Sequence, residues 1–203
     1  MVSPFYFVIG ALTSPPFRLL YRLRARGKEN LPATGGYVLA PNHISNLDPW
    51  PLGLPLWPGR QLRFMAKDEL FRTPLKPILT LAGAFRVNRG QGDEGAIKTA
   101  IRLAREGEAI AIFPEGTRRA KGLAKRRRAR PHTGAARVAL GAGVPLIPAA
   151  ISGTDRLTRL APLRVVYGPP VELDDLRDLD IRRGAREATN RLMAAIGELE
   201  STL

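Results

Sequence analysis

Cysteine is absent from the 203 residues of this sequence. Its absence excludes disulfide frameworks, thiolate zinc sites and cysteine nucleophiles. A chain of about 200 residues can still fold as one domain around a substantial hydrophobic core, without disulfides or a structural metal. Histidine is scarce, so His43 and His132 are the two imidazoles that the chain offers to acid–base chemistry.

Acidic residues are missing from two segments that are rich in bases. Residues 18–28 carry five arginines or lysines and residues 118–137 carry nine, so they account for the whole formal net charge of +14. This charge predicts an anionic partner, namely nucleic acid, a lipid surface or a phosphorylated substrate. Nucleic acid is disfavoured, because the second segment has no aromatic residue except His132 and the chain has no zinc-finger, RNP or heptad pattern. For residues 120–130 alone, a solvated basic loop without a single ligand is the alternative.

The sequence also lacks an apolar run of the roughly 20 residues that a membrane-spanning helix needs. The apolar stretch at residues 4–12 is followed by Pro15-Pro16 and Arg18, and its bases come after it, unlike those of a secretory signal. We expect residues 1–28 to form an amphipathic, membrane-associating helical segment, with apolar side chains in the lipid surface and bases at anionic headgroups. The alternative is a helix packed on the domain core.

Short apolar runs alternate with helical patterns through residues 29–203, which we expect to form one α/β domain. The expected strands are 37–40, 62–66, 84–88, 109–113, 145–151 and 163–167, and the expected helices are 94–105, 133–142 and 182–200. The alternation predicts a largely parallel central sheet flanked by helices and preceded by the N-terminal amphipathic helical segment. Chemistry should then lie in loops at the carboxyl edge of the sheet. The proline-rich stretch 49–58 cannot be one regular helix, and three places are open for its two tryptophans: the core, an apolar channel or the lipid.

The first string with chemical potential is Asn42-His-Ile-Ser-Asn-Leu-Asp48, directly after an expected strand. A tight turn could return the Asp48 carboxylate to one nitrogen of His43. That bond would fix the tautomer and leave the other nitrogen as a general base. The ordinary alternative is that Asp48 caps the following helix. The nearby Ser45 hydroxyl is expected to be structural.

Two further strings place polar groups at strand ends. Phe113-Pro-Glu-Gly-Thr-Arg118 follows an apolar strand, and its Gly116 lets backbone N–H groups approach an anion while Arg118 can clamp phosphate. The string GAFRVNR at residues 83–89 ends in Arg89. Both strings favour a site that binds an anionic substrate.

Taken in order, these strings resemble the sequence blocks of the PlsC-like glycerolipid acyltransferases, the group that contains 1-acylglycerol-3-phosphate O-acyltransferase. NHISNLD is similar to the family's NHxSxxD (HX4D) block, and GAFRVNR, FPEGTR and VPLIPAAI resemble its second, third and fourth blocks, over residues 42–151. The resemblance implies an α/β domain with a membrane-contacting helical segment before it. It also implies transfer of a fatty acyl group from acyl-CoA or acyl-carrier protein to a glycerol hydroxyl.

The resemblance also implies roles for individual residues. His43 matches the catalytic base and Asp48 the residue that orients it. The positions tied to binding the acceptor's glycerol phosphate are Arg89, Glu115, Gly116, Thr117 and Arg118. The family often has a lysine after the third block where this chain has Pro131-His132. His132 or the Arg-rich loop before it is a substitute contact for phosphate, with a plain surface residue as the alternative for His132.

The expected reaction is acylation of the sn-2 hydroxyl of 1-acylglycerol-3-phosphate (lysophosphatidic acid), which gives phosphatidic acid in phospholipid biosynthesis. A glycerol hydroxyl needs a base, whereas the thioester is already activated, so we expect direct transfer with no metal and no cofactor besides the thioester co-substrate. The enzyme should be peripheral or monotopic at the cytoplasmic face of the cell membrane, on an anionic surface and without nucleic acid. One alternative is another lysolipid acceptor, such as an ornithine lipid, a lysophospholipid or a glycolipid. The other is a non-enzymatic protein that binds anionic lipid or nucleic acid.

Overall fold

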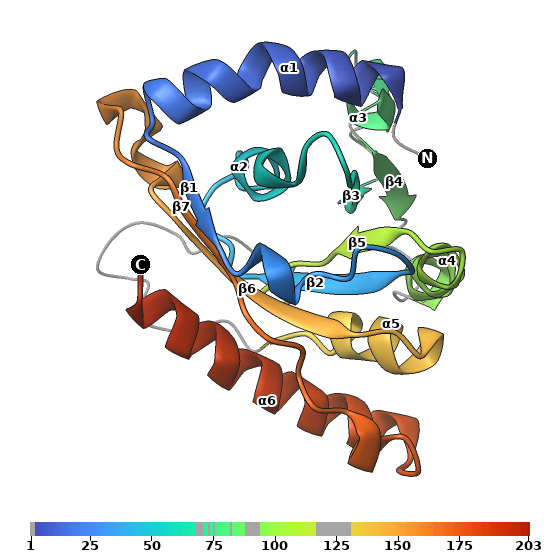
Figure 1. Cartoon of the computed structure of the whole chain (residues 1–203). Coiled ribbons are helices and arrows are strands. Elements are labelled where there is room, and N and C mark those ends of the chain that lie inside the picture. Colours follow the sequence, from blue (N-terminus) through green and yellow to red (C-terminus); the bar gives the residue numbers. More distant parts are fainter. Residues whose placement is uncertain are drawn as a thin grey trace.

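The computed structural model describes residues 3–67, 71–72, 74, 76–81, 83–87, 94–116 and 131–203, which form a seven-stranded sheet with helices on both faces (Figure 1). The strands are β1 Arg24–Arg26, β2 Tyr37–Pro41, β3 Leu62–Lys67, β4 Ala84–Val87, β5 Ala109–Ala111, β6 Leu146–Ser152 and β7 Arg164–Tyr167. Their order is β1-β7-β6-β2-β5-β3-β4, and all neighbours are parallel except β6 and β7. The predicted α/β class with a largely parallel sheet is therefore confirmed.

The helices cover the two faces of the sheet unequally. They are α1 Pro4–Leu19, α2 Pro49–Gly53, α3 Lys76–Leu81, α4 Glu94–Arg105, α5 Gly134–Ala142 and α6 Ile181–Ser201. On one face, α4, α5 and α6 bury alanine, leucine and isoleucine against the strands. On the other face, α2 packs on a smaller core and α1 lies above it (Figure 1).

Periodicity explains the elements that the sequence predicted well. All five residues of β2 are buried, as expected for a central strand whose continuous apolar run is covered on both faces. Helix α4 buries Ile97, Ala100 and Ala104, which share one helical face. Helix α6 begins after Asp180, whose carboxylate accepts the N–H groups of Arg182 and Arg183.

One strand was missed. Residues 24–26 were expected within the N-terminal helical segment, but they form β1, which pairs in parallel with β7 at the edge of the sheet. The sequence Arg-Ala-Arg has neither β-branched nor aromatic residues, so no local signal marks it as a strand. The helix itself ends at Leu19.

The sheet order places three loops together. Strands β6, β2 and β5 are adjacent and parallel, so their carboxyl ends lie at the same edge. From that edge emerge residues 42–48 after β2, residues 112–116 after β5 and residues 153–154 after β6. The histidine string and the Phe-Pro-Glu-Gly string thus meet through tertiary structure, as the expected sheet required.

Candidate active site

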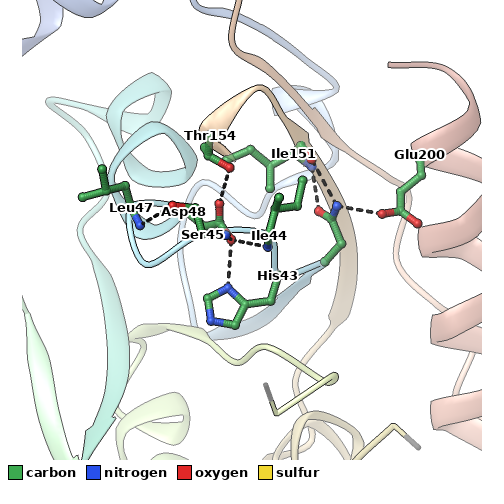
Figure 2. Close-up of polar contacts among 9 residues, drawn as sticks. His43, Ile44, Ser45, Leu47, Asp48, Ile151, Thr154 and Glu200 are labelled. Atoms are coloured by element: carbon green, nitrogen blue, oxygen red, sulfur yellow. Dashed lines mark hydrogen bonds and ion pairs between the residues drawn. The ribbon is translucent and has the colours of Figure 1, made fainter. Parts of the chain in front are cut away.

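The turn after β2 brings the Asp48 carboxylate back to the imidazole of His43 (Figure 2). His43 Nδ1 lies 2.8 Å from Asp48 Oδ2. Since a carboxylate accepts hydrogen bonds, the neutral ring carries its proton on Nδ1 and leaves the Nε2 lone pair available. An imidazole held in this tautomer can act as a general base, and the adjacent negative charge stabilises the imidazolium that forms when Nε2 takes a proton.

Asp48 is 0 % exposed, so hydrogen bonds must stabilise its buried carboxylate in place of water. Besides His43, the backbone N–H groups of Ile44 and Ser45 donate to Oδ2 over 2.7 and 2.9 Å. The hydroxyl of Thr154 donates to Oδ1 over 2.5 Å (Figure 2). Helix α2 begins at the next residue, yet the Asp48 side chain makes no capping hydrogen bond to it, so the helix-cap alternative is wrong.

Thr154 is a contact that sequence reasoning missed. It lies 106 residues from Asp48 and reaches it because β6, which ends at Ser152, is the neighbour of β2. Gly153 has φ 91°, and a Cβ at this position would collide with the carbonyl oxygen of Pro162. Glycine is therefore required to turn the chain so that Thr154 faces the carboxylate.

Asn42 fixes the start of the same turn. Its Oδ1 accepts the N–H of Ile151 over 2.8 Å, and its Nδ2 donates to the Ile151 carbonyl over 3.1 Å. The same Nδ2 also lies 2.7 Å from a carboxylate oxygen of Glu200 in α6. The hydrogen bonds of this buried amide attach the loop to β6 and α6 and so hold the backbone next to His43 in place.

The ring of Phe113 stacks on the imidazole of His43. The ring centroids are 4.1 Å apart and the planes are inclined by 28°. The sequence predicted a strand over residues 109–113, but β5 ends at Ala111, and the following loop presents Phe113 to the imidazole. This contact limits rotation of the imidazole and brings the third string next to the first.

His132 and the Glu-Gly turn of the third string lie against each other. Gly116 has φ 66°, and a Cβ there would overlap the imidazole of His132. The N–H of His132 donates to the carbonyl of Pro114 over 2.7 Å, and Glu115 is buried. The structure therefore brings together His43, Asp48, Glu115 and Gly116 with His132, whereas the other predicted site residues, Arg89, Thr117 and Arg118, lie outside the described residues.

A cavity of about 240 Å³ with an almost wholly apolar lining opens beside the turn that follows β2. Its wall is formed by α1, by α2 with the residue that follows it, and by β3, through Phe5, Tyr6, Ile9, Gly10, Thr13, Pro49, Trp50, Gly53, Leu54, Leu62 and Phe64. Pro49 and Trp50 follow Asp48 directly, so the cavity begins next to the turn that holds His43 and Asp48. The sequence left open whether the two tryptophans lie in the core, in an apolar channel or in lipid. Trp50 lines the apolar cavity. Trp57 packs on α1, where its Nε1 donates to the Phe7 carbonyl over 3.1 Å.

The hydroxyl of Tyr6 holds α1 over this cavity. It lies 3.2 Å from the carbonyl oxygen of Gly53 and 3.0 Å from that of Arg60. Burial, with a smaller effect of Tyr37, raises the pKa of Tyr6 to about 12, so the hydroxyl stays protonated as a donor well above neutral pH.

Among the residues that the structure describes, no three or more His, Asp or Glu side chains gather where they could hold a metal ion. None of the helices traced there combines the length and apolar character needed to cross a membrane.

Comparison with known proteins agrees with the geometry. The sequence profile of the acyltransferase family matches residues 22–152. The 1-acyl-sn-glycerol-3-phosphate acyltransferase of Bacillus subtilis is 34% identical over 185 residues, which cover 89% of each chain. The protein of the same name from Borreliella burgdorferi is 30% identical over 136 residues, 64% of this chain and 50% of its own length.

A solved structure shares the fold. The crystal structure of the 1-acyl-sn-glycerophosphate (LPA) acyltransferase PlsC from Thermotoga maritima matches with a TM-score of 0.64 at 23% identity, over 96% of this chain and 80% of that one. The family profile spans more than half of the chain, and the Bacillus relative is similar over nearly all of it. This enzyme therefore belongs to the acyltransferase family.

Proposed function

We propose that this acyltransferase moves a fatty acyl group from a thioester donor to the sn-2 hydroxyl of 1-acyl-sn-glycerol-3-phosphate and so forms phosphatidic acid. The observation that carries the proposal is the His43–Asp48 pair, with Nδ1 and Oδ2 2.8 Å apart, next in sequence to Pro49 and Trp50, which line an apolar cavity. The acceptor follows the names of the Bacillus and Borreliella relatives.

In the proposed reaction, Nε2 of His43 takes the proton of the acceptor hydroxyl as its oxygen attacks the thioester carbonyl. The tetrahedral intermediate then collapses, the carbon–sulfur bond breaks, and the imidazolium returns the proton to the leaving thiolate. Asp48 stays ionised throughout and stabilises the imidazolium. A positioned base of this kind accelerates such a step by about 10² to 10⁴-fold.

The cavity between α1, α2 and β3 is the proposed place for the acyl chain. Its lining offers apolar contact, and the carboxyl end of a bound chain would lie toward the turn of Asp48, where Pro49 and Trp50 form the wall. The donor is acyl-CoA or acyl-carrier protein, and no cofactor or metal takes part in the proposed step, because the thioester is already activated.

Helix α1 supports the proposed location at the membrane. Val8, Leu12 and Leu19 share one exposed side of this helix, while Phe5 and Ile9 line the cavity. We propose that α1 and the turn after it are the membrane-associating segment, and that the catalytic domain begins at β1, because residues 24–26 belong to its sheet. The enzyme would bind as a peripheral protein at the cytoplasmic face, where anionic headgroups attract its bases.

An acceptor panel tests the function. One acyl-CoA is offered with lysophosphatidic acid, lysophosphatidylcholine, a lyso-ornithine lipid and monoacylglycerol, and release of free CoA thiol is followed. The proposal expects turnover with lysophosphatidic acid that disappears in His43→Ala. A preference for another lysolipid would show that lysophosphatidic acid is not the acceptor. Full activity of His43→Ala would show that His43 is not the general base.

A further inference from the structure

Two turns lie side by side at the C-terminal end of α1, and we call them the double turn: residues 17–24 and 153–164. The N–H of Leu163 donates to the Tyr21 carbonyl over 2.9 Å, and the N–H of Arg24 donates to the Leu163 carbonyl over 3.1 Å. In Figure 1 the orange segment that carries the short helix η5 Thr154–Arg159 adjoins this end of the blue helix. Backbone hydrogen bonds therefore join two stretches that are distant in sequence into one surface.

The double turn exposes apolar side chains among cations. Leu19 is 77% exposed, Leu20 54% and Leu160 48%. Its bases are Arg18, Arg22, Arg24, Arg156, Arg159 and Arg164, and Asp155 is the one acid in these two ranges of sequence. Arg164 donates to the carbonyls of Arg22 and Leu163, while the other five arginines are exposed. Exposed leucines among exposed arginines indicate a surface that meets something both apolar and anionic.

The backbone of the double turn is strained in two places. Arg22 has φ 45° and Leu160 has φ 49°, and among the described residues these are the two non-glycine residues with positive φ. Leu160 is the left-handed C-cap of η5, where its N–H donates to the Leu157 carbonyl over 3.0 Å. The capped turn leaves the leucine side chain half exposed at the surface.

We propose that the double turn is a contact with an anionic phospholipid bilayer, in which residues 153–164 extend the membrane contact of α1 and the turn that follows it. The proposal rests on the peripheral location proposed above and adds residues 153–164, which the N-terminal sequence did not predict. Lipid fits better than nucleic acid or an acidic carrier protein, because the exposed leucines would enter the headgroup boundary while the arginines meet phosphate. Leu19 also continues the exposed side of α1 into this surface.

This contact would fix the height of the catalytic site above the membrane. Helix η5 begins at Thr154, whose hydroxyl binds Asp48, and ends one residue before Leu160. This short segment, which is kinked at Arg156, thus connects the proposed lipid contact to the catalytic carboxylate. With α1 bound beside it, the turn of His43 would face a lysolipid that leaves the bilayer only partly.

Vesicle co-sedimentation of the full chain tests the contact. Vesicles of phosphatidylcholine mixed with phosphatidylglycerol are compared with vesicles of phosphatidylcholine alone, using Arg159→Glu and Leu160→Asn. Asparagine tolerates positive φ better than leucine, so loss of binding in Leu160→Asn cannot be assigned to a damaged turn. We expect Arg159→Glu to weaken binding to the anionic vesicles by about twentyfold, and Leu160→Asn to weaken it by about tenfold.

Matched controls lie on the opposite side of the sheet. Arg186→Glu in α6 and Leu179→Asn before α6 change an exposed arginine and an exposed leucine there, and both should bind vesicles like the unchanged protein. Wild-type binding by the double-turn variants, or equal losses in the controls, would overturn the proposal. So would an Arg159→Glu variant that loses affinity for DNA or carrier protein but keeps its affinity for vesicles.

Turnover on short-chain, water-dispersed substrates separates this proposal from the proposed function. Arg159→Glu and Leu160→Asn should keep wild-type turnover there, and a loss would mean that the double turn acts within the site instead of at the bilayer. If the unchanged protein turns over no lysolipid, the proposed function fails, while the vesicle measurements still decide the membrane contact.

Discussion

Replacing Asp48 by Asn removes one negative charge from the site while the geometry allows every hydrogen bond to persist. Oδ2 of Asp48 accepts from His43 and from two backbone N–H groups, and Oδ1 accepts from Thr154. An Asn oxygen in the Oδ2 position can accept the same three hydrogen bonds, and its NH₂ group can donate to the Thr154 hydroxyl. His43 would keep its tautomer, so Asp48→Asn isolates the charge that faces the imidazolium.

The magnitude follows from the separation of the charges. Unit charges about 4 Å apart attract by about 4 kcal/mol at an effective dielectric constant of about 20. Since this attraction exists only while Nε2 is protonated, we expect kcat/KM of Asp48→Asn to fall by about 10³-fold. The assay is release of free CoA from acyl-CoA, with thermal unfolding of each variant measured in parallel.

Asp48→Ala is the matched comparison. It removes the charge and also leaves the N–H groups of Ile44 and Ser45 and the hydroxyl of Thr154 without their acceptor in a buried place, so it should lower stability by about 3 kcal/mol or more. Asp48→Asn should unfold near the temperature of the unchanged protein. Activity of Asp48→Asn within a few-fold of wild type would refute the assigned role of the charge, and a large loss of stability in Asp48→Asn would refute the isosteric argument.

Four other substitutions address contacts that the structure revealed. Thr154→Val deletes one hydrogen bond to the Asp48 carboxylate, so kcat should fall about tenfold with little change in acceptor KM, as initial rates would show. Gly116→Ala should destabilise the fold by about 1–3 kcal/mol in thermal melts, while His132→Ala should raise KM for lysophosphatidic acid but not for monoacylglycerol. Because the pKa of Tyr6 is raised to about 12 in the folded state, its contribution to stability is present below about pH 10 and lost as pH rises toward 12. Tyr6→Phe should flatten that alkaline loss in melts recorded against pH, and unchanged alkaline behaviour would contradict it.

The best sequence predictions were local. The helix expected over residues 94–105 has those bounds in the structure, because its apolar residues recur with the helical period. The pairing of His43 with Asp48 spans five residues of one turn and could be anticipated from their spacing. Both features depend on residues that are close together in the sequence, so residue type and spacing are enough to predict them.

Contacts between distant segments were not predictable in the same way. Thr154 meets Asp48, and Asn42 meets Ile151, across more than 100 residues, because the sheet order makes β6 the neighbour of β2. The strand β1 has no propensity signal, and its place depends on the edge that β7 presents. The apolar cavity likewise arises from three elements that no local pattern brings together.

The sequence by itself determined that this is an α/β chain with a histidine–aspartate turn, a Glu-Gly string and an apolar, basic N-terminus. These features follow from periodicity, spacing and charge, which are properties of the chain before it folds. Only the tertiary structure decided that Thr154 holds the buried Asp48, that Phe113 stacks on His43, and that a cavity opens beside them. The physical reason is that the burial of apolar side chains selects the strand order, and the strand order alone determines which loop ends meet.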